Sequence, residues 1–235
     1  MPILYIVATP IGNLKDITLR GLQTLKEVDF ILCEDTRVTR KLLTYYEINK
    51  PFISYHQHSQ LTKVNYIFDL LKQGKNLALV SDAGTPGISD PGNKLIQEIS
   101  VVFGNRVAIM PIPGPSALTA VLSIAGFATG KFCFFGFPPL KNKRKIFFEE
   151  INASKKPVIF YESPYRILKT LNELKILLGA RRIVIGHELT KKFEAIYRGT
   201  AEELFQKFVL LKKEDKRKLA GEFTIIVEGK RLPEE

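Results

Sequence analysis

SDAGTPGISDPG, residues 81–92, connects an apolar run at 77–80 to a helical pattern of apolar residues at 93–103. A buried strand, a loop rich in glycine, proline and aspartate, and a helix in succession are typical of an α/β sheet. In open sheets of this kind, ligands bind in loops that leave the carboxyl ends of the strands. Three glycines, two prolines and two aspartates exceed what a helix cap needs, so we predict a ligand site here. The alternative is a stiff connection in which Asp90 caps the helix.

The same alternation of strand and helix patterns continues on both sides of this loop. In the first half, strands are expected at 3–8, 30–33, 52–55, 77–80 and 107–110, and helices at 18–28, 37–46, 64–71 and 93–103. In the second half, strands are expected at 132–135, 158–161, 183–185 and 223–227, and helices at 116–125, 143–151, 165–178 and 202–211. Short loops between them indicate two α/β domains with mainly parallel or mixed sheets.

A cluster of helix and strand breakers interrupts this alternation near the middle of the chain. Prolines at 111, 113 and 115 surround the glycine at 114. Domain boundaries are often rich in proline and glycine. We therefore predict an N-terminal α/β domain at 1–112 and a C-terminal α/β domain at 113–235.

The composition is strongly basic. Of the 235 residues, 35 are Lys or Arg and 24 are Asp or Glu, which gives a formal net charge of +11. This excess suggests a polyanionic partner such as RNA, DNA or an acidic membrane surface, with a functionally neutral basic surface as the alternative. A hydrophobic fraction of 45% excludes a disordered basic tail.

Several kinds of site and segment are absent from the sequence. Cys33 and Cys133 lie far apart and form no CxxC, so neither a structural zinc site nor a disulfide framework is expected, and we predict no metal site. No run approaches the roughly 18–20 apolar residues of a membrane span. The N-terminus lacks the basic segment of a signal peptide. We therefore expect a cytoplasmic protein without membrane contact.

The glycine pattern excludes the common nucleotide-binding motifs. No G-x-G occurs in the chain, which removes the dinucleotide fingerprint of a Rossmann domain and the glycine loop of Rossmann-type methyltransferases. The Gly-Lys pairs lack the remaining residues of a Walker A loop. A nucleotide-like ligand would therefore be bound by another arrangement.

Charged and small residues follow several other predicted strands. The stretch 34–37, EDTR, is followed by Arg40 and Lys41, which suit phosphate contact; N-capping of a helix by Asp35 or Thr36 is the alternative. The basic and aromatic stretch 141–148 is typical of RNA-binding segments, and an amphipathic helix with Phe147 and Phe148 in the core is its alternative.

Six motifs occur in order along the chain: VATPIGNL (7–14), EDTR (34–37), SDAGTPGISDPG (81–92), PGPSA (113–117), FYES (160–163) and ELTK (188–191). Together they resemble the ribosomal small-subunit RNA 2′-O-ribose methyltransferases of the tetrapyrrole-methylase superfamily. The resemblance spans the chain from about Ile3 to Gly229. It implies two α/β domains with S-adenosylmethionine in the cleft between them, and a homodimer that methylates a cytidine ribose in RNA of the small ribosomal subunit.

The resemblance also implies which residues contact the cofactor. Carried over by position, these are Pro10, Ser81, Asp82, Ala83, Gly84, Ile88, Ser116, Ala117, Tyr161, Leu189, Ala220 and Gly221. One departure lies among them, because relatives often carry a basic residue where this chain has Ala220. That departure touches only an edge of the cofactor site.

Methyl transfer to a ribose hydroxyl is an in-line displacement in which the hydroxyl proton must be removed or shared. Candidates for handling that proton are Glu162, Asp35 and Lys191. Candidates for contacting RNA are Arg37, Arg40, Lys41, Lys143, Arg144 and Arg166. The alternatives are a methylase acting on a tetrapyrrole and a non-catalytic RNA-binding factor of ribosome assembly. The basic charge favours RNA over a tetrapyrrole.

Overall fold

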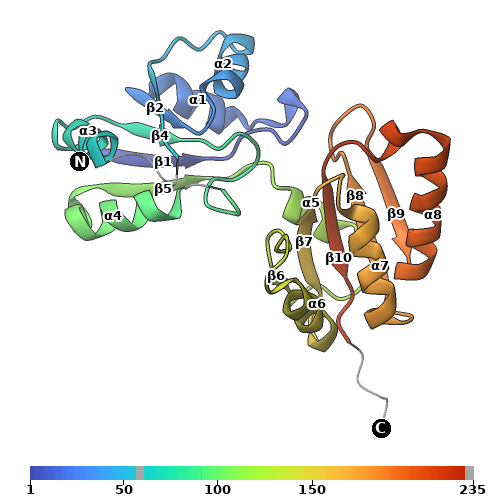
Figure 1. The fold of residues 1–235 in the computed structure, drawn as a ribbon. Helices are drawn as coiled ribbons and strands as arrows, with labels where there is room; N and C mark the ends of the chain where they lie inside the picture. Colours follow the sequence, from blue (N-terminus) through green and yellow to red (C-terminus); the bar gives the residue numbers. More distant parts are fainter. Residues whose placement is uncertain (57–60, 91, 231–235) are drawn as a thin grey trace. The chain divides into compact units, whose positions relative to one another are not determined.

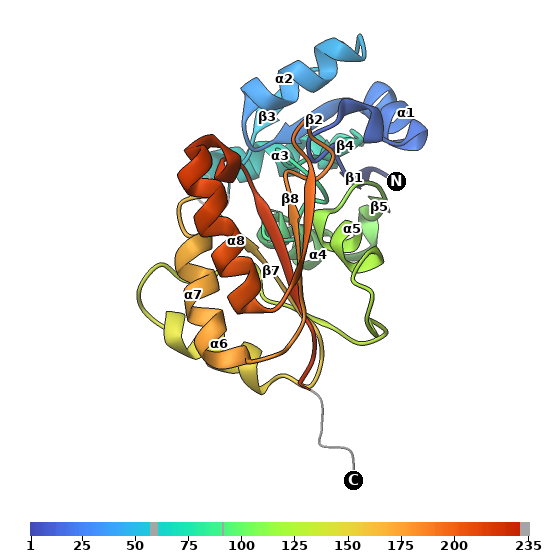
Figure 2. The ribbon, with the colours of Figure 1, turned by 90° about the vertical axis from the view of Figure 1, so that its right-hand side faces the viewer.

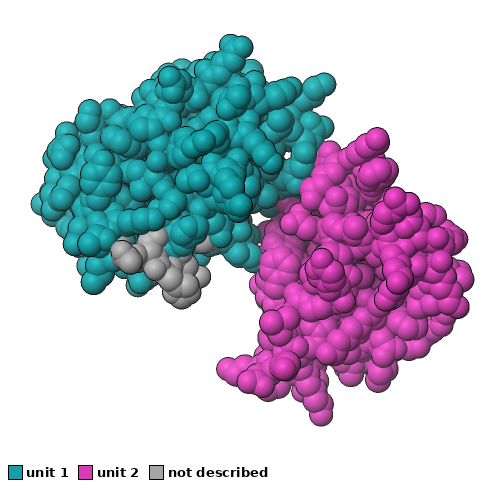
Figure 3. Space-filling view, turned by 45° about the horizontal axis from the view of Figure 1, so that its top comes forward, with its two compact units in different colours: residues 1–116 teal, residues 117–235 magenta. Residues whose placement is uncertain are grey.

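The structure is a computed structural model that describes residues 1–56, 61–90 and 92–230. The chain divides into two compact units, Met1–Ser116 (unit 1) and Ala117–Glu235 (unit 2), which are coloured separately in Figure 3. No helix within the described residues is long and apolar enough to cross a membrane.

Unit 1 is built on a five-stranded parallel sheet with the order β3-β2-β4-β1-β5. Its strands are β1 (Ile3–Val7), β2 (Phe30–Cys33), β3 (Phe52–Ser54), β4 (Leu77–Leu79) and β5 (Ala108–Ile112). Its helices are α1 (Leu19–Glu27), α2 (Thr36–Tyr45), α3 (Leu61–Lys72) and α4 (Asn93–Phe103), with short 3₁₀ turns η1 (Leu14–Asp16) and η2 (Gly104–Arg106).

Helices cover both faces of this sheet. Leu4 and Leu32 share a hydrophobic core with side chains of α3 and α4, whereas Val7 and Ile31 share another with side chains of α1 and α2. Figure 1 shows α1 and α2 above the strands and α4 below them. Because the inner strands β1, β2 and β4 are largely buried on both faces, their sequences are continuous apolar runs. This burial explains why the strands are recognisable from the sequence.

Unit 2 contains a mixed five-stranded sheet with the order β6-β7-β10-β8-β9. Its strands are β6 (Cys133–Phe134), β7 (Val158–Glu162), β8 (Ile183–His187), β9 (Ala195–Gly199) and β10 (Phe223–Val227). Its helices are α5 (Ala117–Ser123), α6 (Arg144–Ala153), α7 (Ile167–Leu178) and α8 (Ala201–Glu214), followed by the 3₁₀ turn η3 (Lys216–Leu219). Only the β6–β7 ladder of this sheet is parallel in the part of unit 2 that the structure describes.

One face of the sheet in unit 2 packs against α6, α7 and α8, through side chains such as Phe148, Leu171 and Phe208. Figure 2 shows these three helices together on one side of the sheet. The prediction of two α/β units with parallel or mixed sheets is thereby confirmed. The prediction missed β9, because its sequence AIYRG shows no regular alternation and its residues are only partly buried.

The boundary between the two units falls between Ser116 and Ala117, whereas the sequence predicted it between residues 112 and 113. The unit boundary falls after Ser116 because the proline segment stays with unit 1. The backbone of Gly114 approaches the side chain of Ala8 so closely that a Cβ atom would lie 3.0 Å away. Thr85 Oγ1 also donates a hydrogen bond to the Pro115 carbonyl, at 3.3 Å. These contacts depend on residues distant in sequence.

Polar loops gather at one edge of each sheet. In unit 1 every strand is parallel, so the carboxyl ends of all five strands share an edge. In unit 2, Phe223 at the start of β10 pairs with Glu162 and with His187, the last residues of β7 and β8, and His187 pairs with Ala195 at the start of β9. The loops after β7 and β8 and the loop before β10 therefore lie together.

Candidate active site

The carboxyl ends of β1 and β4 are joined by a pair of hydrogen bonds. Thr9 N donates to Gly84 O at 2.8 Å, and Gly84 N donates to Thr9 O at 3.0 Å. The buried Thr9 hydroxyl also donates to Ser81 O at 3.0 Å. Gly84 has a φ of +81°, which glycine adopts without the penalty of a side chain. The structure therefore brings Pro10 beside the turn made by Ser81, Asp82, Ala83 and Gly84.

The remaining cofactor candidates near unit 1 follow this turn. Ile88 N donates a weak hydrogen bond to Thr85 O at 3.3 Å, which folds the loop back on itself. Ser116 ends unit 1, and Ala117 begins α5 in unit 2. Thr85 ties this segment to the loop through its bond to Pro115. The loop after β4 and the proline segment are thus neighbours.

Asp35 caps α2, as the alternative interpretation of EDTR proposed. Its carboxylate accepts hydrogen bonds from Arg37 N at 2.8 Å and from the Arg37 guanidinium, whose Nη2 lies 2.6 Å away. Its own backbone N–H donates to Asp82 Oδ1 at 3.0 Å, which ties the ends of β2 and β4 together. The hydrogen bonds from Arg37 lower the pKa of Asp35 to about 2. A carboxylate with so low a pKa is a weak base.

We expect Arg37→Ala to raise the pKa of Asp35 from about 2 toward the ordinary value near 3.9. The depressed pKa stabilises the folded state above about pH 4, and this contribution is lost as the pH falls from about 4 to about 2. Titration of the carboxyl carbon by NMR measures the pKa directly. Lys41→Ala, on the same helix, is the control and should leave it unchanged. An unaltered midpoint in Arg37→Ala would contradict the assignment.

Glu34 is a residue that the sequence prediction passed over. It follows the last residue of β2 at the edge that carries Asp35 and Asp82. Burial raises its pKa, and the negative charges of Asp82 and Asp35 add to the rise, whereas the nearby His56 opposes it. The acidic pair after an apolar strand was the available signal. Which of the two carboxylates is desolvated depends on tertiary packing.

The cofactor candidates of unit 2 lie at the shared edge of its sheet. Tyr161, near the end of β7, contacts the rings of Phe134 and Phe137, with centroids 5.1 and 5.3 Å away. Leu189 is buried because it folds over Gly186, where a side chain would collide with it. Ala220, which precedes β10, is exposed. The edge therefore combines an aromatic ring, a leucine and exposed backbone.

A small set of polar contacts holds the loop after β8 against the loop before β10. We call Glu188, Lys191, Gly221 and Glu222 the loop lock. Glu188 Oε1 accepts from Glu222 N at 2.9 Å and from Lys191 Nζ at 2.8 Å, and Lys191 Nζ lies 3.0 Å from Glu222 Oε2. Glu188 adopts a φ of +49°, an uncommon value for a side-chain-bearing residue. This strain is maintained by the surrounding contacts.

The loop lock also defines the charge of Lys191. Burial alone would lower its pKa, but the hydrogen bonds to Glu188 and Glu222 outweigh that effect and raise it. Lys191 therefore stays protonated at neutral pH. The hypothesis that it removes a proton is not supported by this geometry, whereas a role as a fixed positive charge is compatible with it.

His187, the last residue of β8, also contacts the segment before β10. Its Nε2 lies 2.7 Å from Ala220 O, so this nitrogen carries the proton, and its ring stacks on Phe223 with a centroid distance of 4.3 Å. Burial lowers the pKa of His187, partly opposed by the bond to Ala220. A neutral imidazole at pH 7 thus holds the Ala220 carbonyl in place.

Glu162 was predicted as a catalytic candidate, and the structure argues against that role. Its side chain is fully buried. One oxygen accepts from Thr170 Oγ1 at 2.5 Å, and the other accepts from Ser163 N at 2.7 Å and pairs with Arg166 Nε at 2.9 Å. With both oxygens engaged inside unit 2 and the side chain fully buried, the carboxylate supports the fold and is shielded from a ribose.

Arg144 and Arg166 were predicted to contact RNA, but the structure engages both guanidinium groups in contacts within unit 2. Arg144 is buried with 6% of its side chain exposed, and its guanidinium bonds Glu173, with Nη2 2.8 Å from Oε2, and the Thr170 hydroxyl at 2.7 Å. Arg166 bonds Glu162 and the Pro138 carbonyl, the latter at 2.9 Å. Both cations are neutralised within unit 2, which the sequence could not reveal because their partners come from other elements.

The other predicted RNA contacts are on the surface, and no observation tests their role. Arg37, Arg40 and Lys41 are exposed on α2, and Lys143 is exposed before α6. The guanidinium of Arg40 lies over the ring of Phe52, 5.4 Å from its centroid. Within the described parts of the chain, no group of three or more His, Cys, Asp or Glu side chains is placed to hold a metal ion.

Comparisons with known proteins agree with this architecture. The profile of the family Tetrapyrrole (Corrin/Porphyrin) Methylases matches residues 3–204. The chain is similar to the "Ribosomal RNA small subunit methyltransferase I" of Haemophilus influenzae, at 46% identity over 97% of this chain and 79% of that protein. The protein of the same name from Thermotoga maritima is 41% identical over 97% of this chain and 98% of that protein.

Solved structures with the same fold include methyltransferases of tetrapyrrole synthesis. A cobalt precorrin-4 methyltransferase superposes with a TM-score of 0.64 at 18% identity, covering 96% of this chain and 94% of that one. A uroporphyrin-III-C-methyltransferase from Thermus thermophilus gives 0.62 at 16% identity, covering 97% and 94%. At these identities the likeness shows the fold alone. Together with the family match, it confirms the resemblance seen in the six motifs: the chain belongs to the tetrapyrrole (corrin/porphyrin) methylase family.

Proposed function

We propose that this chain transfers a methyl group from S-adenosylmethionine to the 2′-hydroxyl of a cytidine ribose in RNA of the small ribosomal subunit. The observation that carries this proposal is the identity of 41–46% over nearly the whole chain to proteins named ribosomal RNA small subunit methyltransferase I. The formal charge of +11 suits a polyanionic substrate better than a tetrapyrrole. We further propose that it acts in the cytoplasm as a homodimer on RNA or on the assembled subunit.

The residues at the sheet edges fit S-adenosylmethionine. In unit 1 the candidates are Pro10, Ile88 and the turn Ser81–Gly84, because this turn is closed by backbone bonds and carries the Asp82 carboxylate. In unit 2, Tyr161 and Leu189 supply apolar contact, and the exposed Ala220 and the half-buried Gly221 supply peptide groups suited to a nucleoside. When bound, this cofactor supplies an electrophilic methyl group on a sulfonium.

The hydroxyl proton requires an acceptor at one of these edges. Among the candidates, Asp35 is weakly basic, Lys191 is protonated, and Glu162 is enclosed. Glu34 lies beside Asp35 and Asp82, and burial and their negative charges raise its pKa, which makes it a better proton acceptor than Asp35. We therefore add Glu34 to the candidates and place it first.

We expect Glu34→Gln to reduce the single-turnover rate of methyl transfer by at least about tenfold, because the amide cannot accept the proton. Asp35→Asn and Lys191→Met should lower the rate less when measured on protein saturated with cofactor. Glu162→Gln should act mainly on stability. The measurement is rapid-quench methyl transfer over a pH series. A Glu34→Gln rate equal to that of the wild type would exclude Glu34 as the proton acceptor.

The reaction itself is tested by offering three acceptors in parallel. Tritiated methyl transfer from S-adenosylmethionine is measured to unmodified small subunits, to protein-free small-subunit RNA and to a tetrapyrrole. We expect label in RNA and, after nuclease digestion, in 2′-O-methylcytidine. Label only in the tetrapyrrole would favour the small-molecule methylase. Absence of cofactor binding by calorimetry would favour the non-catalytic assembly factor.

A further inference from the structure

The junction between α8 and η3 is the first of two basic elements at the site edge of unit 2. We call its cations, which are Lys212, Lys213, Lys216, Arg217 and Lys218, the α8–η3 corner. Arg217 pairs with Asp215 at 2.8 Å and Lys218 with Glu214 at 2.6 Å. Within the described residues, Lys212, Lys213 and Lys216 have no carboxylate partner, and all three are exposed. The corner therefore carries uncompensated positive charge.

The tip of the loop between β8 and β9 is the second element. Phe193 has 72% of its surface exposed, which is unusual for so large an apolar side chain. Lys192 Nζ lies 5.5 Å from the centroid of its ring. Backbone hydrogen bonds hold the loop: Lys191 N donates to Glu188 O and Glu194 N donates to Lys191 O, each at 3.0 Å. A fixed loop thus presents an aromatic face and a cation to solvent.

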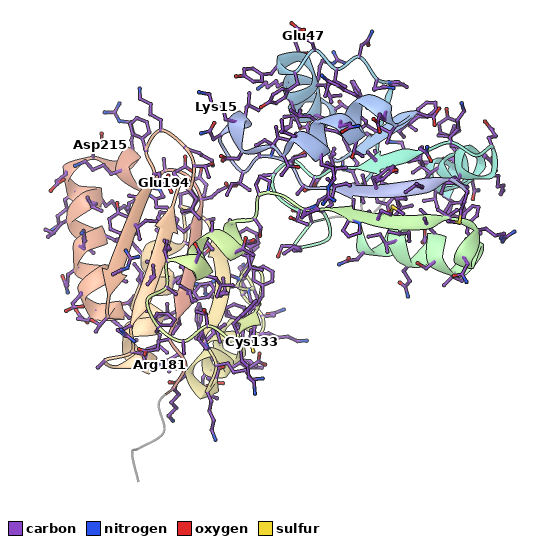
Figure 4. The ribbon with its side chains drawn as sticks, turned by 180° about the vertical axis from the view of Figure 1, so that it is seen from behind. Lys15, Glu47, Cys133, Arg181, Glu194 and Asp215 are labelled. Carbon is purple, nitrogen blue, oxygen red and sulfur yellow. The ribbon has the colours of Figure 1, made fainter. Side chains whose placement is uncertain are left out.

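Both elements lie at the sheet edge that carries the cofactor candidates of unit 2. Figure 4 shows Glu194, in the β8–β9 loop, and Asp215, before η3, at one end of unit 2, with Arg181 and Cys133 at the other. The corner leads directly into Ala220, because η3 ends at Leu219. The loop lock joins the β8–β9 loop to the same segment through Lys191 and Glu222.

We propose that the α8–η3 corner and the Lys192–Phe193 tip form an RNA-binding surface, in which the corner contacts phosphates and Phe193 stacks on an unpaired base. Exposed aromatic rings beside cations are how proteins hold unstacked bases, and lysines without counterions are how they hold the backbone. This inference rests on the proposed function, which makes RNA the substrate. It assigns the RNA contacts of unit 2 to this surface in place of Arg144 and Arg166.

The phosphate contacts are tested by salt dependence. In single-stranded RNA, each phosphate contact adds about 0.7 to the slope of log affinity against log salt. Replacing Lys212, Lys213 and Lys216 together by alanine should reduce that slope by about 2 and weaken binding of protein-free small-subunit RNA about tenfold or more at low salt. The matched control replaces Lys131, Lys155 and Lys156, exposed at the opposite edge, and should leave the slope within about 0.5 of the wild-type value.

The stacking contact is tested by Phe193→Ala. We expect about tenfold weaker RNA binding with an unchanged salt slope, and recovery of affinity in Phe193→Trp, because stacking needs a ring and not a charge. Phe132→Ala, an exposed phenylalanine before β6, is the control. Light scattering on the same variants reports the oligomeric state. Loss of self-association in Phe193→Ala, with RNA affinity intact, would overturn the proposal.

Methyl transfer by the wild-type protein separates this inference from the function on which it rests. If the wild type methylates RNA and neither variant changes RNA binding, the surface is wrong and the function stands. If the wild type binds RNA with the expected dependence on both elements but transfers no methyl group to RNA, the surface stands and the function fails. If the wild type does not bind RNA at all, the surface is overturned.

Discussion

Replacing Arg144 with methionine is expected to lower the free energy of unfolding by about 3 kcal/mol, because it breaks a buried charge network. The side chain of Arg144 is only 6% exposed and bonds Glu173, Thr170 and the Pro139 carbonyl. Its Nη2 also lies 3.8 Å from Glu162 Oε2. Methionine fills similar space but leaves the Thr170 hydroxyl and the Glu173 carboxylate without their donor. Differential scanning calorimetry should show a Tm lower by roughly 6–12 °C.

The control for this substitution is Lys145→Met, one position along α6. Lys145 has 89% of its side chain exposed, and its only carboxylate contact among the described residues is a distant one with Glu149 at 3.7 Å. Its loss should change stability by no more than about 0.5 kcal/mol. The pair also distinguishes the two interpretations of Arg144. If Arg144 contacted RNA instead, Arg144→Met would reduce the salt slope of RNA binding and leave Tm unchanged. That result would contradict the buried network.

Gly221→Ala is expected to destabilise unit 2 by about 3 kcal/mol and to weaken binding of S-adenosylmethionine at least about tenfold. Gly221 has a φ of +102°, and a Cβ on it would overlap the carboxyl group of Glu188. The overlap would push Glu188 away from Glu222 N and Lys191 Nζ. The loops that carry Leu189 and Ala220 would then lose the contacts that hold them together.

The control for the loop lock is Gly126→Ala. Gly126 also has a positive φ, +72°, but nothing lies within 4 Å of where its Cβ would be. This variant carries backbone strain without the collision, so it should lose about 1 kcal/mol and keep its affinity for the cofactor. Isothermal titration calorimetry measures the affinity, and urea denaturation measures the stability. Equal cofactor affinity in both variants would show that the loop lock does not shape the cofactor site.

Unit 1 is the part of the molecule that the sequence predicts best. Its inner strands β1, β2 and β4 are largely buried on both faces, so they are continuous apolar runs such as Leu77–Leu79, and each is followed by a loop with glycine, proline or charge. Parallel strands then bring all their carboxyl ends to one edge, so the site loops follow from topology alone. Neither the hydrogen bonds of Thr9 with Gly84 nor the raised pKa of Glu34 is visible in the sequence, because both depend on neighbouring strands.

In unit 2, sequence patterns do not predict the roles of individual residues. The basic stretch around Arg144 reads as an RNA contact, yet that arginine faces Glu162 and Glu173 on other elements. Strand β9 is half-buried and lacks alternation, so only its pairing with β8 identifies it.

The local sequence was sufficient for the fold class and the family, because these depend on apolar runs and on short motifs read within a few residues. The roles of individual charged groups were decided by contacts between distant segments. Arg144 and Arg166 became structural because buried charges must be paired, and Glu188 became part of the loop lock because Glu222 folds back beside it. Whether a charged side chain is available to a partner at the surface or is paired inside the fold depends on its burial, and burial is determined only when the chain has folded.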